Sequence, residues 1–295
     1  MKHIFIINSI SGKGKAKKMA SIIEEVCKDM NIDYELIYTK YHGHIREIAS
    51  SYTSKDDVTL YSVGGDGTIL EILNGIDPDI PLGAIPGGSG EDFFRYFNLD
   101  TKDIRKYIKD TIEASPIKID IGETSKMKFI NTTSFGIDAT INENASEMIR
   151  KTILTKGPAY VLSIIKNVIT MKATKTKLVV DGKKYDNDYL IVCCMNGSYY
   201  GNGVCSAPHS DMQDGYFDLI LLEKVKGPKI YKLLINFLTG NVDKSPEIKT
   251  IHAKNIVIDT DEPVNIQSDG ENYKLNHLEI NMKESYLKLK IPASK

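Results

Sequence analysis

The sequence predicts a mixed α/β plus β protein of two domains, and three observations support this fold class. Up to residue 116, strand-like apolar runs alternate with apolar patterns at helical spacing, which is typical of a parallel sheet covered by helices. From residue 117, short strand-like runs follow one another with turn dipeptides between them, as in an antiparallel sandwich. The length of 295 residues also fits two domains better than one. We therefore expect an N-terminal α/β domain with a largely parallel sheet (residues 1–116) and a C-terminal antiparallel β-sandwich domain with one or two helices (residues 117–285). The final residues 286–295 are a candidate for return to the first domain.

Glycine-rich segments follow three of the four strands expected in the first domain. The strands cover residues 3–8, 34–38, 58–63 and 80–85, and the glycine-rich segments cover residues 9–15, 64–68 and 86–97. The carboxyl ends of parallel strands meet at one edge of the sheet, and folds of this kind bind their ligands there. We therefore expect these segments to contribute to one site.

The segment GGDGT, residues 64–68, lies between a run of β-forming residues and a helical apolar pattern that begins at Ile69. A glycine loop in this position lets backbone N–H groups surround a phosphate group, and glycine lets the chain approach the ligand closely. Asp66 would repel a bare phosphate group, so its presence indicates a cation or a hydroxyl group between the two. The alternative is a glycine-rich turn in which Asp66 is the helix N-cap.

Four turn dipeptides and two apolar helices mark the second domain. Each dipeptide predicts a turn between antiparallel strands, and the four are Asp181–Gly182, Asn196–Gly197, Asp214–Gly215 and Asp269–Gly270. The helices are expected near residues 157–171 and 230–238, where apolar residues recur at helical spacing. Such apolar stripes are usually core, and membrane contact is the alternative.

Composition and charge argue against several classes of protein. The formal net charge is −1, which gives no reason to expect a nucleic-acid partner. No run approaches the roughly 20 apolar residues that span a bilayer, and the N-terminus lacks the pattern of a signal peptide. The 4 cysteines have neither CxxC spacing nor histidine partners, so free thiols are expected. These features predict a cytoplasmic protein.

Five motifs together resemble the signatures of a known family. In chain order they are NSISGKG at residues 8–14, GGDGT at 64–68, PGGSGEDFFR at 86–95, APHSDMQDGYFDL at 207–219 and QSDGE at 267–271. They are similar to the motifs of the bacterial diacylglycerol kinase family, the soluble lipid kinases related to sphingosine and ceramide kinases. GGDGT alone is less specific, because NAD kinases and phosphofructokinases carry similar loops. The last two motifs separate these families.

The resemblance implies a kinase of two domains with ATP in the cleft between them. Such an enzyme would transfer the γ-phosphoryl group of ATP to the hydroxyl of diacylglycerol or a related lipid, with Mg²⁺. Backbone amides and hydroxyl groups suit phosphate oxygens. By position, the resemblance assigns nucleotide contacts to Asn8, Ser11, Thr39, Gly64, Gly65, Asp66, Gly67, Thr68 and Ser89. For Thr39 and Ser89, ordinary turn residues are the alternative.

The resemblance also implies a structural Mg²⁺ site at the turn formed by Asp214 and Gly215. There the carboxylate of Asp214 would act with the main-chain carbonyl groups of Asp211 and Tyr216. Ordered waters would connect the metal to an acidic network formed by Asp92 and Asp66. Mg²⁺ prefers oxygen ligands and keeps several waters, so a site with few protein ligands is chemically reasonable. Without the resemblance, Asp214–Gly215 is simply a hairpin turn.

The catalytic base is expected within the QSDGE motif. Phosphoryl transfer to an alcohol needs a positioned group that accepts the hydroxyl proton, and a carboxylate suits this role. Asp269 is our first choice, with Glu271 in support, and the reverse assignment stays open. Asp66 completes the expected catalytic set. The alternative for this motif is a polar hairpin turn.

The motifs also depart from the family pattern. Ser9 and Ile10 stand where the family usually has proline, and Glu91 stands where it has an amide. A carboxylate near a triphosphate is unfavourable unless Mg²⁺, Lys13 or Lys15 offsets its charge. A catalytically impaired nucleotide or lipid sensor of the same fold is therefore one alternative function. The other is a soluble-metabolite kinase of the NAD type, which GGDGT suggests.

A lipid substrate implies transient, peripheral contact with the inner face of the membrane. The candidate surface is the helix expected at residues 157–171, because lysines lie around it and cations favour anionic lipid surfaces. These lysines are Lys151, Lys156, Lys166, Lys172, Lys175 and Lys177. A solvated charged surface beside a core helix is the alternative. By analogy with the family, a homodimer is a candidate assembly.

Overall fold

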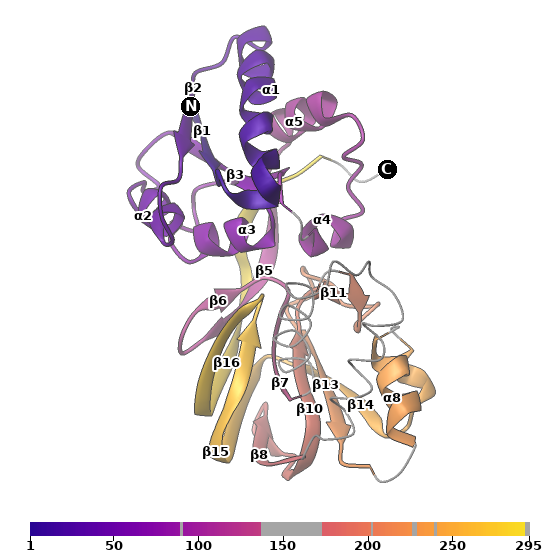
Figure 1. Cartoon of the computed structure of the whole chain (residues 1–295). Helices are drawn as coiled ribbons and strands as arrows, with labels where there is room; N and C mark the ends of the chain where they lie inside the picture. The colour runs from indigo at the N-terminus through magenta and orange to yellow at the C-terminus, as the bar shows by residue number, and fades with distance from the viewer. Residues whose placement is uncertain (89–90, 137–172, 202, 226–228, 239–240, 293–295) are drawn as a thin grey trace. The chain divides into compact units, whose positions relative to one another are not determined.

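A computed structural model describes residues 1–88, 91–136, 173–201, 203–225, 229–238 and 241–292. The chain divides into two compact units, which are described separately. Unit 1 comprises Met1–Ile121, Met212–Asp214 and Lys283–Lys295, and unit 2 comprises Gly122–Asp211 and Gly215–Met282. The mixed, strand-rich α/β architecture agrees with the predicted fold class (Figure 1).

The sheet of unit 1 contains four strands from the N-terminal part of the chain and the end of the last strand. Its order is β2 (Tyr34–Tyr38), β1 (Lys2–Ile7), β3 (Val58–Gly64), β4 (Leu82–Pro86) and the end of β16 (Glu271–Lys290). Each of these pairings is parallel. The carboxyl ends of β1 to β4 therefore lie at the same edge of the sheet. Leu289 and Lys290 pair with Leu82 and Gly83, so the final residues of the chain return to this sheet.

Helices cover both faces of this sheet (Figure 1). On one face, α1 (Lys15–Asp29) and α5 (Ile104–Glu113) pack on side chains such as Phe5 and Val63. The alternate positions Ile4, Ile6 and Leu60 are also completely buried, because α2 (His44–Ser50) and α3 (Asp66–Leu73) cover the other face. The described part of unit 1 also contains the 3₁₀ turn η1 (Ser11–Gly14) and the helix α4 (Asp92–Tyr96).

Unit 2 is an antiparallel β structure. Its main sheet has the order β14 (Ile248–Ala253), β13 (Phe217–Glu223), β10 (Asn187–Met195), β7 (Thr132–Gly136), β15 (Asn255–Ser268) and β16. Strand β8 (Thr174–Val180) pairs with β10, β15 and β9 (Lys183–Lys184). The smaller strands are β6 (Lys128–Phe129), β11 (Tyr199–Tyr200) and β12 (Val204–Cys205), and the helical elements among the described residues of this unit are α8 (Lys229–Leu238) and η2 (Val242–Lys244). Strand β5 (Ile117–Thr124) begins in unit 1 and ends in unit 2.

The two faces of this sheet belong to two apolar clusters. Ile191, Cys193 and Met195 alternate along β10 with Val192 and Cys194, as the two-residue period of a strand requires. The first three residues belong to a cluster that includes α8, which we call the α8-side cluster. Val192 and Cys194 belong to the cluster on the opposite face, which contains buried side chains of β8, β15 and β16. Both faces of the sheet are thus buried.

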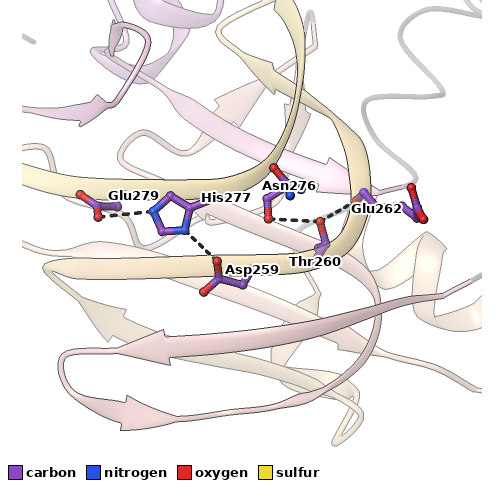
Figure 2. A network of polar contacts seen from close by, with 6 residues as sticks. All are labelled: Asp259, Thr260, Glu262, Asn276, His277 and Glu279. Carbon is purple, nitrogen blue, oxygen red and sulfur yellow. Dashed lines mark hydrogen bonds and ion pairs between the residues drawn. The ribbon is translucent and has the colours of Figure 1, made fainter.

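Among the short strand-like runs expected in the second domain are NIVIDT (residues 255–260) and PVNIQSDG (residues 263–270), and these two form one strand, β15, which ends at Ser268. Its pairing with β16 shifts between Asp259 and Val264, and the strand continues beyond this irregularity. Thr260 Oγ1 donates to the carbonyl of Glu262 at 2.7 Å, which stabilises the irregular stretch (Figure 2). Bulges of this kind tolerate Pro263, because no ladder hydrogen bond is required of it there.

A histidine on β16 joins two carboxylates beside this irregularity (Figure 2). His277 Nδ1 lies 2.7 Å from Asp259 Oδ1, and Nε2 lies 3.4 Å from Glu279 Oε1. The hydrogen bond to Asp259 raises the pKa of His277. The cluster is exposed, so we expect it to contribute little to the free energy of unfolding.

Several sequence predictions fall on other parts of the fold. The helix expected at residues 157–171, with Lys151, Lys156, Lys166 and Lys172, lies outside the described residues. The second helix is present as α8. Cys27, Cys193, Cys194 and Cys205 are free thiols, as predicted. Among the helices that the structure describes, none has the length and apolar character needed to cross a bilayer.

Candidate functional site

Three glycine-rich segments of unit 1 contact one another directly. A Cβ atom on Gly12 would lie 2.4 Å from the carbonyl oxygen of Gly87, and one on Gly88 would lie 2.3 Å from the Cα of Gly65. Side chains do not fit at such distances from backbone atoms, so these two positions require glycine. Gly12 also has φ of +56°, a conformation that glycine adopts readily. The segments that follow β1, β3 and β4 are therefore brought together at one edge of the sheet.

Hydrogen bonds connect these segments. The N–H of Gly87 donates to the carbonyl of Gly64 at 2.8 Å, and the N–H of Asn8 donates to the carbonyl of Val63 at 3.1 Å. The side chain of Asn8 also reaches the GGDGT loop, where Nδ2 donates to Thr68 Oγ1 at 3.1 Å. Thr68 is 2% exposed, so its hydroxyl holds the loop from inside. The predicted residues Asn8, Gly64 and Thr68 thus belong to one connected structure.

Two further predicted nucleotide contacts lie on the same edge. The N–H of Ser11 donates to the carbonyl of Asn8 at 3.0 Å, which places Ser11 at the start of η1. The N–H of Thr39 donates to the carbonyl of Ile7 at 3.0 Å, so Thr39 directly follows the paired ends of β1 and β2. Ser89 lies outside the described residues. Glu91, the residue that departs from the family pattern, is exposed immediately before α4.

Helix α3 begins at Asp66, three residues earlier than the apolar pattern from Ile69 predicted. Gly65 is its N-cap, so the alternative in which Asp66 caps the helix is wrong. Gly67 is exposed in the first turn, and no atom lies within 4 Å of a Cβ built on it. Helix N-termini favour anions because their first N–H groups point outward and the helix dipole is positive there. This geometry suits an anionic group over Gly67.

Asp66 and Asp92 lie beside each other at this edge. Asp66 accepts hydrogen bonds from the N–H groups of Asp92 at 3.1 Å and Phe93 at 3.3 Å. Burial raises the pKa of Asp66 to about 6, although these N–H groups oppose the shift. Asp92 is 5% exposed and forms an ion pair with Arg95. The site therefore contains two acidic side chains, one of which carries its charge only at a cost.

The raised pKa of Asp66 predicts a pH dependence of stability. The ionised form of Asp66 is disfavoured in the folded state. The native protein therefore has its full free energy of unfolding below about pH 4, where Asp66 is protonated, and loses part of it as pH rises through about 6. The shift corresponds to roughly 2–3 kcal/mol. We expect the unfolding free energy of Asp66→Asn, relative to the native sequence, to increase by about this amount between pH 4 and 7. Urea unfolding of both proteins at several pH values measures this, and a difference that stays constant with pH would contradict it.

Asp269 lies at the hairpin turn between β15 and β16 in unit 2. Its carboxylate accepts hydrogen bonds from the N–H groups of Ile130 at 2.6 Å, Asn131 at 3.0 Å and Thr132 at 2.9 Å. Asp269 has φ of +45° and Gly270 has φ of +97°, as an Asp-Gly hairpin turn requires. The carboxylate thus joins this turn to the start of β7.

Replacing Asp269 by asparagine is expected to lower the free energy of unfolding by roughly 1.5–3 kcal/mol. Asparagine tolerates positive φ, so the turn itself is kept. However, one of the two carboxylate oxygens that accept hydrogen bonds from backbone N–H groups is lost. Chemical denaturation measures the effect. Asp181→Asn is the matched control. Asp181 also begins an Asp-Gly hairpin turn and accepts hydrogen bonds from the N–H groups of Lys254 and Asn255, but it is exposed, so its loss should cost less. Equal effects of the two substitutions would contradict the assigned role.

Glu271 has a different environment from Asp269. It is exposed at the first position of β16, directly opposite the buried Ser268 in the strand register. The chain reverses between the two carboxylates, so they differ in burial although they are two residues apart. Of the two, Glu271 is the more exposed.

The predicted metal ligands lie in the loop between β12 and β13. These two strands do not pair with each other, so the prediction of a hairpin turn at Asp214–Gly215 is wrong. Gly215 has φ of +76°, and the dipeptide forms a bend in this loop. The N–H of Met212 donates to Tyr96 Oη at 2.8 Å, and the carbonyl of Met212 accepts from the N–H of Asp120. In the part of the chain that the structure describes, no group of three or more His, Cys, Asp or Glu side chains is placed to hold a metal ion. The predicted set, Asp211, Asp214 and Tyr216, relies instead on one carboxylate and two carbonyl oxygens.

Sequence reasoning missed the groups that hold the Asp269 carboxylate and the loop of the predicted metal ligands. The N–H groups of residues 130–132, which hold Asp269, lie in a segment that was interpreted only as a strand. Tyr96, which holds the loop of the predicted metal ligands, was interpreted as part of a polar glycine-rich segment. Neither role has a spacing signal, because both depend on contacts between residues more than 100 positions apart.

Two family descriptions match the chain in succession. Residues 2–124 match the diacylglycerol kinase catalytic domain, and residues 131–289 match the YegS C-terminal NAD kinase beta sandwich-like domain. A diacylglycerol kinase of Bacillus subtilis (strain 168) is 26% identical over 90% of this chain and 88% of its own length. A diacylglycerol kinase of Staphylococcus carnosus (strain TM300) is 26% identical over 90% of this chain and 87% of its own length.

A solved structure shares the fold. The crystal structure of a diacylglycerol kinase from Bacillus anthracis str. Sterne superposes with a TM-score of 0.75, covering 100% of this chain and 98% of its own. Its sequence identity of 22% is low, so this likeness supports the fold alone.

Proposed function

Because this chain belongs to the bacterial diacylglycerol kinase family of lipid kinases, we propose that it transfers the γ-phosphoryl group of ATP to the hydroxyl of diacylglycerol or a related lipid, with Mg²⁺. The observation that carries the proposal is the direct contact of three glycine-rich segments at the carboxyl edge of the unit 1 sheet. Backbone amides that no side chain covers suit the oxygens of a triphosphate.

The glycine-rich edge of unit 1 binds ATP in this proposal. Gly64, Gly65 and Gly67 place backbone groups near the phosphates, and Ser89 is included by the resemblance alone. The side chains of Asn8, Ser11, Thr39 and Thr68 add polar groups around them. The exposed Gly67 at the start of α3 is the position at which a phosphate group approaches the backbone most closely.

Glu271 is the proposed proton acceptor. A general base needs free access to the hydroxyl and a lone pair directed toward it. The Asp269 carboxylate accepts hydrogen bonds from three backbone N–H groups, which occupy lone pairs that a general base would direct toward the hydroxyl. Asp269 then positions the hairpin, and Glu271 at its other end accepts the proton of the lipid hydroxyl.

Mg²⁺ fits the chemistry of the proposed residues. Asp214 supplies a carboxylate oxygen, and Asp211 and Tyr216 supply carbonyl oxygens, which are the donors that Mg²⁺ prefers. Bound Mg²⁺ would offset the negative charge of the phosphates and of the acidic pair. Asp66 and Asp92 would face it through water, with Arg95 holding Asp92 in place.

Membrane contact and dimerisation are further parts of the proposal. A lipid substrate requires the protein to dock on the bilayer surface. The described lysines of the candidate surface are Lys175 and Lys177, both exposed on β8. Lys175 lies 3.9 Å from Asp261, and Lys177 is opposite Asp259 in the register, so acidic neighbours offset part of their charge.

Incubation with ATP labelled at the γ-phosphate tests the proposal. We expect label in the lipid fraction of a bacterial lipid extract, with the reaction lost when Mg²⁺ is chelated. A parallel incubation with NAD tests the second candidate, a soluble-metabolite kinase, which the match to an NAD kinase beta sandwich-like domain favours. Label in neither acceptor would leave a catalytically impaired sensor.

A further inference from the structure

A tyrosine in the loop between β2 and α2 is exposed and yet fixed in position. Tyr41 is 56% exposed. Its hydroxyl donates to Glu47 Oε2 at 2.6 Å, and one face of its ring stacks on His44, with the ring centroids 4.6 Å apart and an angle of 23° between the ring planes. Single exposed apolar side chains are common and need no explanation. An exposed ring that is held at its tip and on one face is different, because it is already positioned to stack on another flat group.

The histidine behind this ring is also held in place. The N–H of Lys40 donates to His44 Nδ1 at 3.1 Å, and the N–H of His44 donates to the carbonyl of Tyr41 at 3.3 Å. Gly43 has φ of +88°, so the chain turns sharply just before His44. The loop is therefore a compact turn in which His44 covers one face of Tyr41 and the exposed area lies on the rest of the ring.

This loop begins at the same level of the sheet as the GGDGT loop. Ile7 on β1 is opposite both Tyr38, the last residue of β2, and Val63 near the end of β3. The ends of β2 and β3 are therefore two strand spacings apart, which is roughly 10 Å. Thr39, a predicted nucleotide contact, lies between the end of β2 and Tyr41 in the chain. Tyr41 thus follows the same carboxyl edge of the sheet to which the proposed function assigns ATP.

A second contact connects the loop with α3. His42 Nδ1 lies 3.9 Å from Glu71 Oε1. Glu71 follows Gly67 by four residues, which is about one helical turn and roughly 6 Å along the helix axis. The loop is thus next to the helix whose first turn receives a phosphate group in the proposed function. The ribose and phosphate groups of one nucleotide span an interval of this size.

We propose that Tyr41, backed by His44, is the surface on which the base of the bound nucleotide stacks. This inference rests on the proposed function, from which it takes the position of the phosphate group at Gly67. Bases stack on aromatic side chains because every base has a flat π face. Tyr41 is fixed before the ligand arrives, so little side-chain entropy is lost on binding.

The groups around Tyr41 favour a base over an acyl chain. The carboxylate of Glu47 and the imidazole of His44 lie next to the ring, and the neighbouring side chains of Lys40 and His42 are exposed. An acyl chain placed against these groups would displace their water without offering a hydrogen bond in return. A base carries donors and acceptors around its edge, so it stacks on the ring while its edge stays in contact with polar groups and water.

Calorimetric titration with ATP and with tripolyphosphate tests the inference, because tripolyphosphate keeps the phosphate chain and lacks the base. We expect Tyr41→Ala to weaken ATP binding by about tenfold and to leave tripolyphosphate binding unchanged. Tyr41→Phe should retain most of the native ATP affinity, because it keeps the ring and loses only the hydrogen bond to Glu47.

Tyr38→Ala is the matched control. Tyr38 is also exposed, but the alternation of β2 directs it to the face of Tyr34 and Leu36, which pack on the cluster that contains α1. It therefore points away from α2, which carries Glu47. This variant should bind both ligands as the native protein does.

The outcomes separate the inference from the function on which it rests. Native ATP affinity in Tyr41→Ala, or an equal loss for ATP and tripolyphosphate, would overturn the inference while leaving the kinase proposal in place. Equal affinity of the native protein for ATP and tripolyphosphate would overturn it too, because the base would then add nothing. ATP binding that depends on Tyr41, without phosphorylation of any lipid, would support the inference although the proposed function fails. If the native protein bound neither ligand, both would fail.

Discussion

Replacing Glu271 by glutamine is expected to lower kcat for lipid phosphorylation by roughly 10²- to 10⁴-fold, because glutamine cannot accept the hydroxyl proton. The substitution keeps the size of the side chain, and Glu271 is exposed. We therefore expect the free energy of unfolding to change by no more than about 0.5 kcal/mol. The KM for ATP should also stay the same, since Glu271 has no assigned part in nucleotide binding.

Steady-state kinetics and chemical denaturation on the same preparations check this prediction. Asp269→Asn provides the comparison, because its expected primary effect is on stability rather than on proton transfer. A Glu271→Gln protein that retains native kcat would contradict the assignment of Glu271. If Asp269→Asn then lost kcat without losing stability, Asp269 would be the base after all.

Replacing Gly67 by alanine is expected to weaken ATP binding by at least about tenfold without destabilising the protein. No atom lies within 4 Å of the added Cβ, and alanine is favoured over glycine in a helix by roughly 1 kcal/mol. The free energy of unfolding should therefore stay the same or rise. The methyl group would stand where a phosphate group approaches the first turn of α3, so the loss should fall on the ligand.

Calorimetric titration with ATP and with tripolyphosphate measures this effect. Both ligands should lose affinity, because the clash is with phosphate rather than with the nucleoside. Gly88→Ala is the contrasting variant: its Cβ would lie 2.3 Å from the Cα of Gly65, so the protein itself should lose stability. Native ATP affinity in Gly67→Ala would place the triphosphate away from α3.

The sequence predicted local elements well where one short pattern determines them. The strand at residues 34–38 has the predicted bounds, and the Asp181–Gly182 and Asp269–Gly270 dipeptides form hairpin turns with positive φ. Boundaries were less accurate where glycine and polar residues begin an element, as at α3, because the apolar periodicity starts only after the first turn. Strand β15 was divided in two, since Pro263 resembles a terminator when its pairing with β16 is not known.

The sequence by itself determined the family, the glycine-rich loops and the choice of chemistry, because these depend on residue types at short, fixed spacing. Tertiary structure decided what each polar residue does. It placed three N–H groups around Asp269 and left Glu271 exposed. Hydrogen-bond satisfaction and burial depend on residues far away in the chain, and a local sequence pattern carries no information about them.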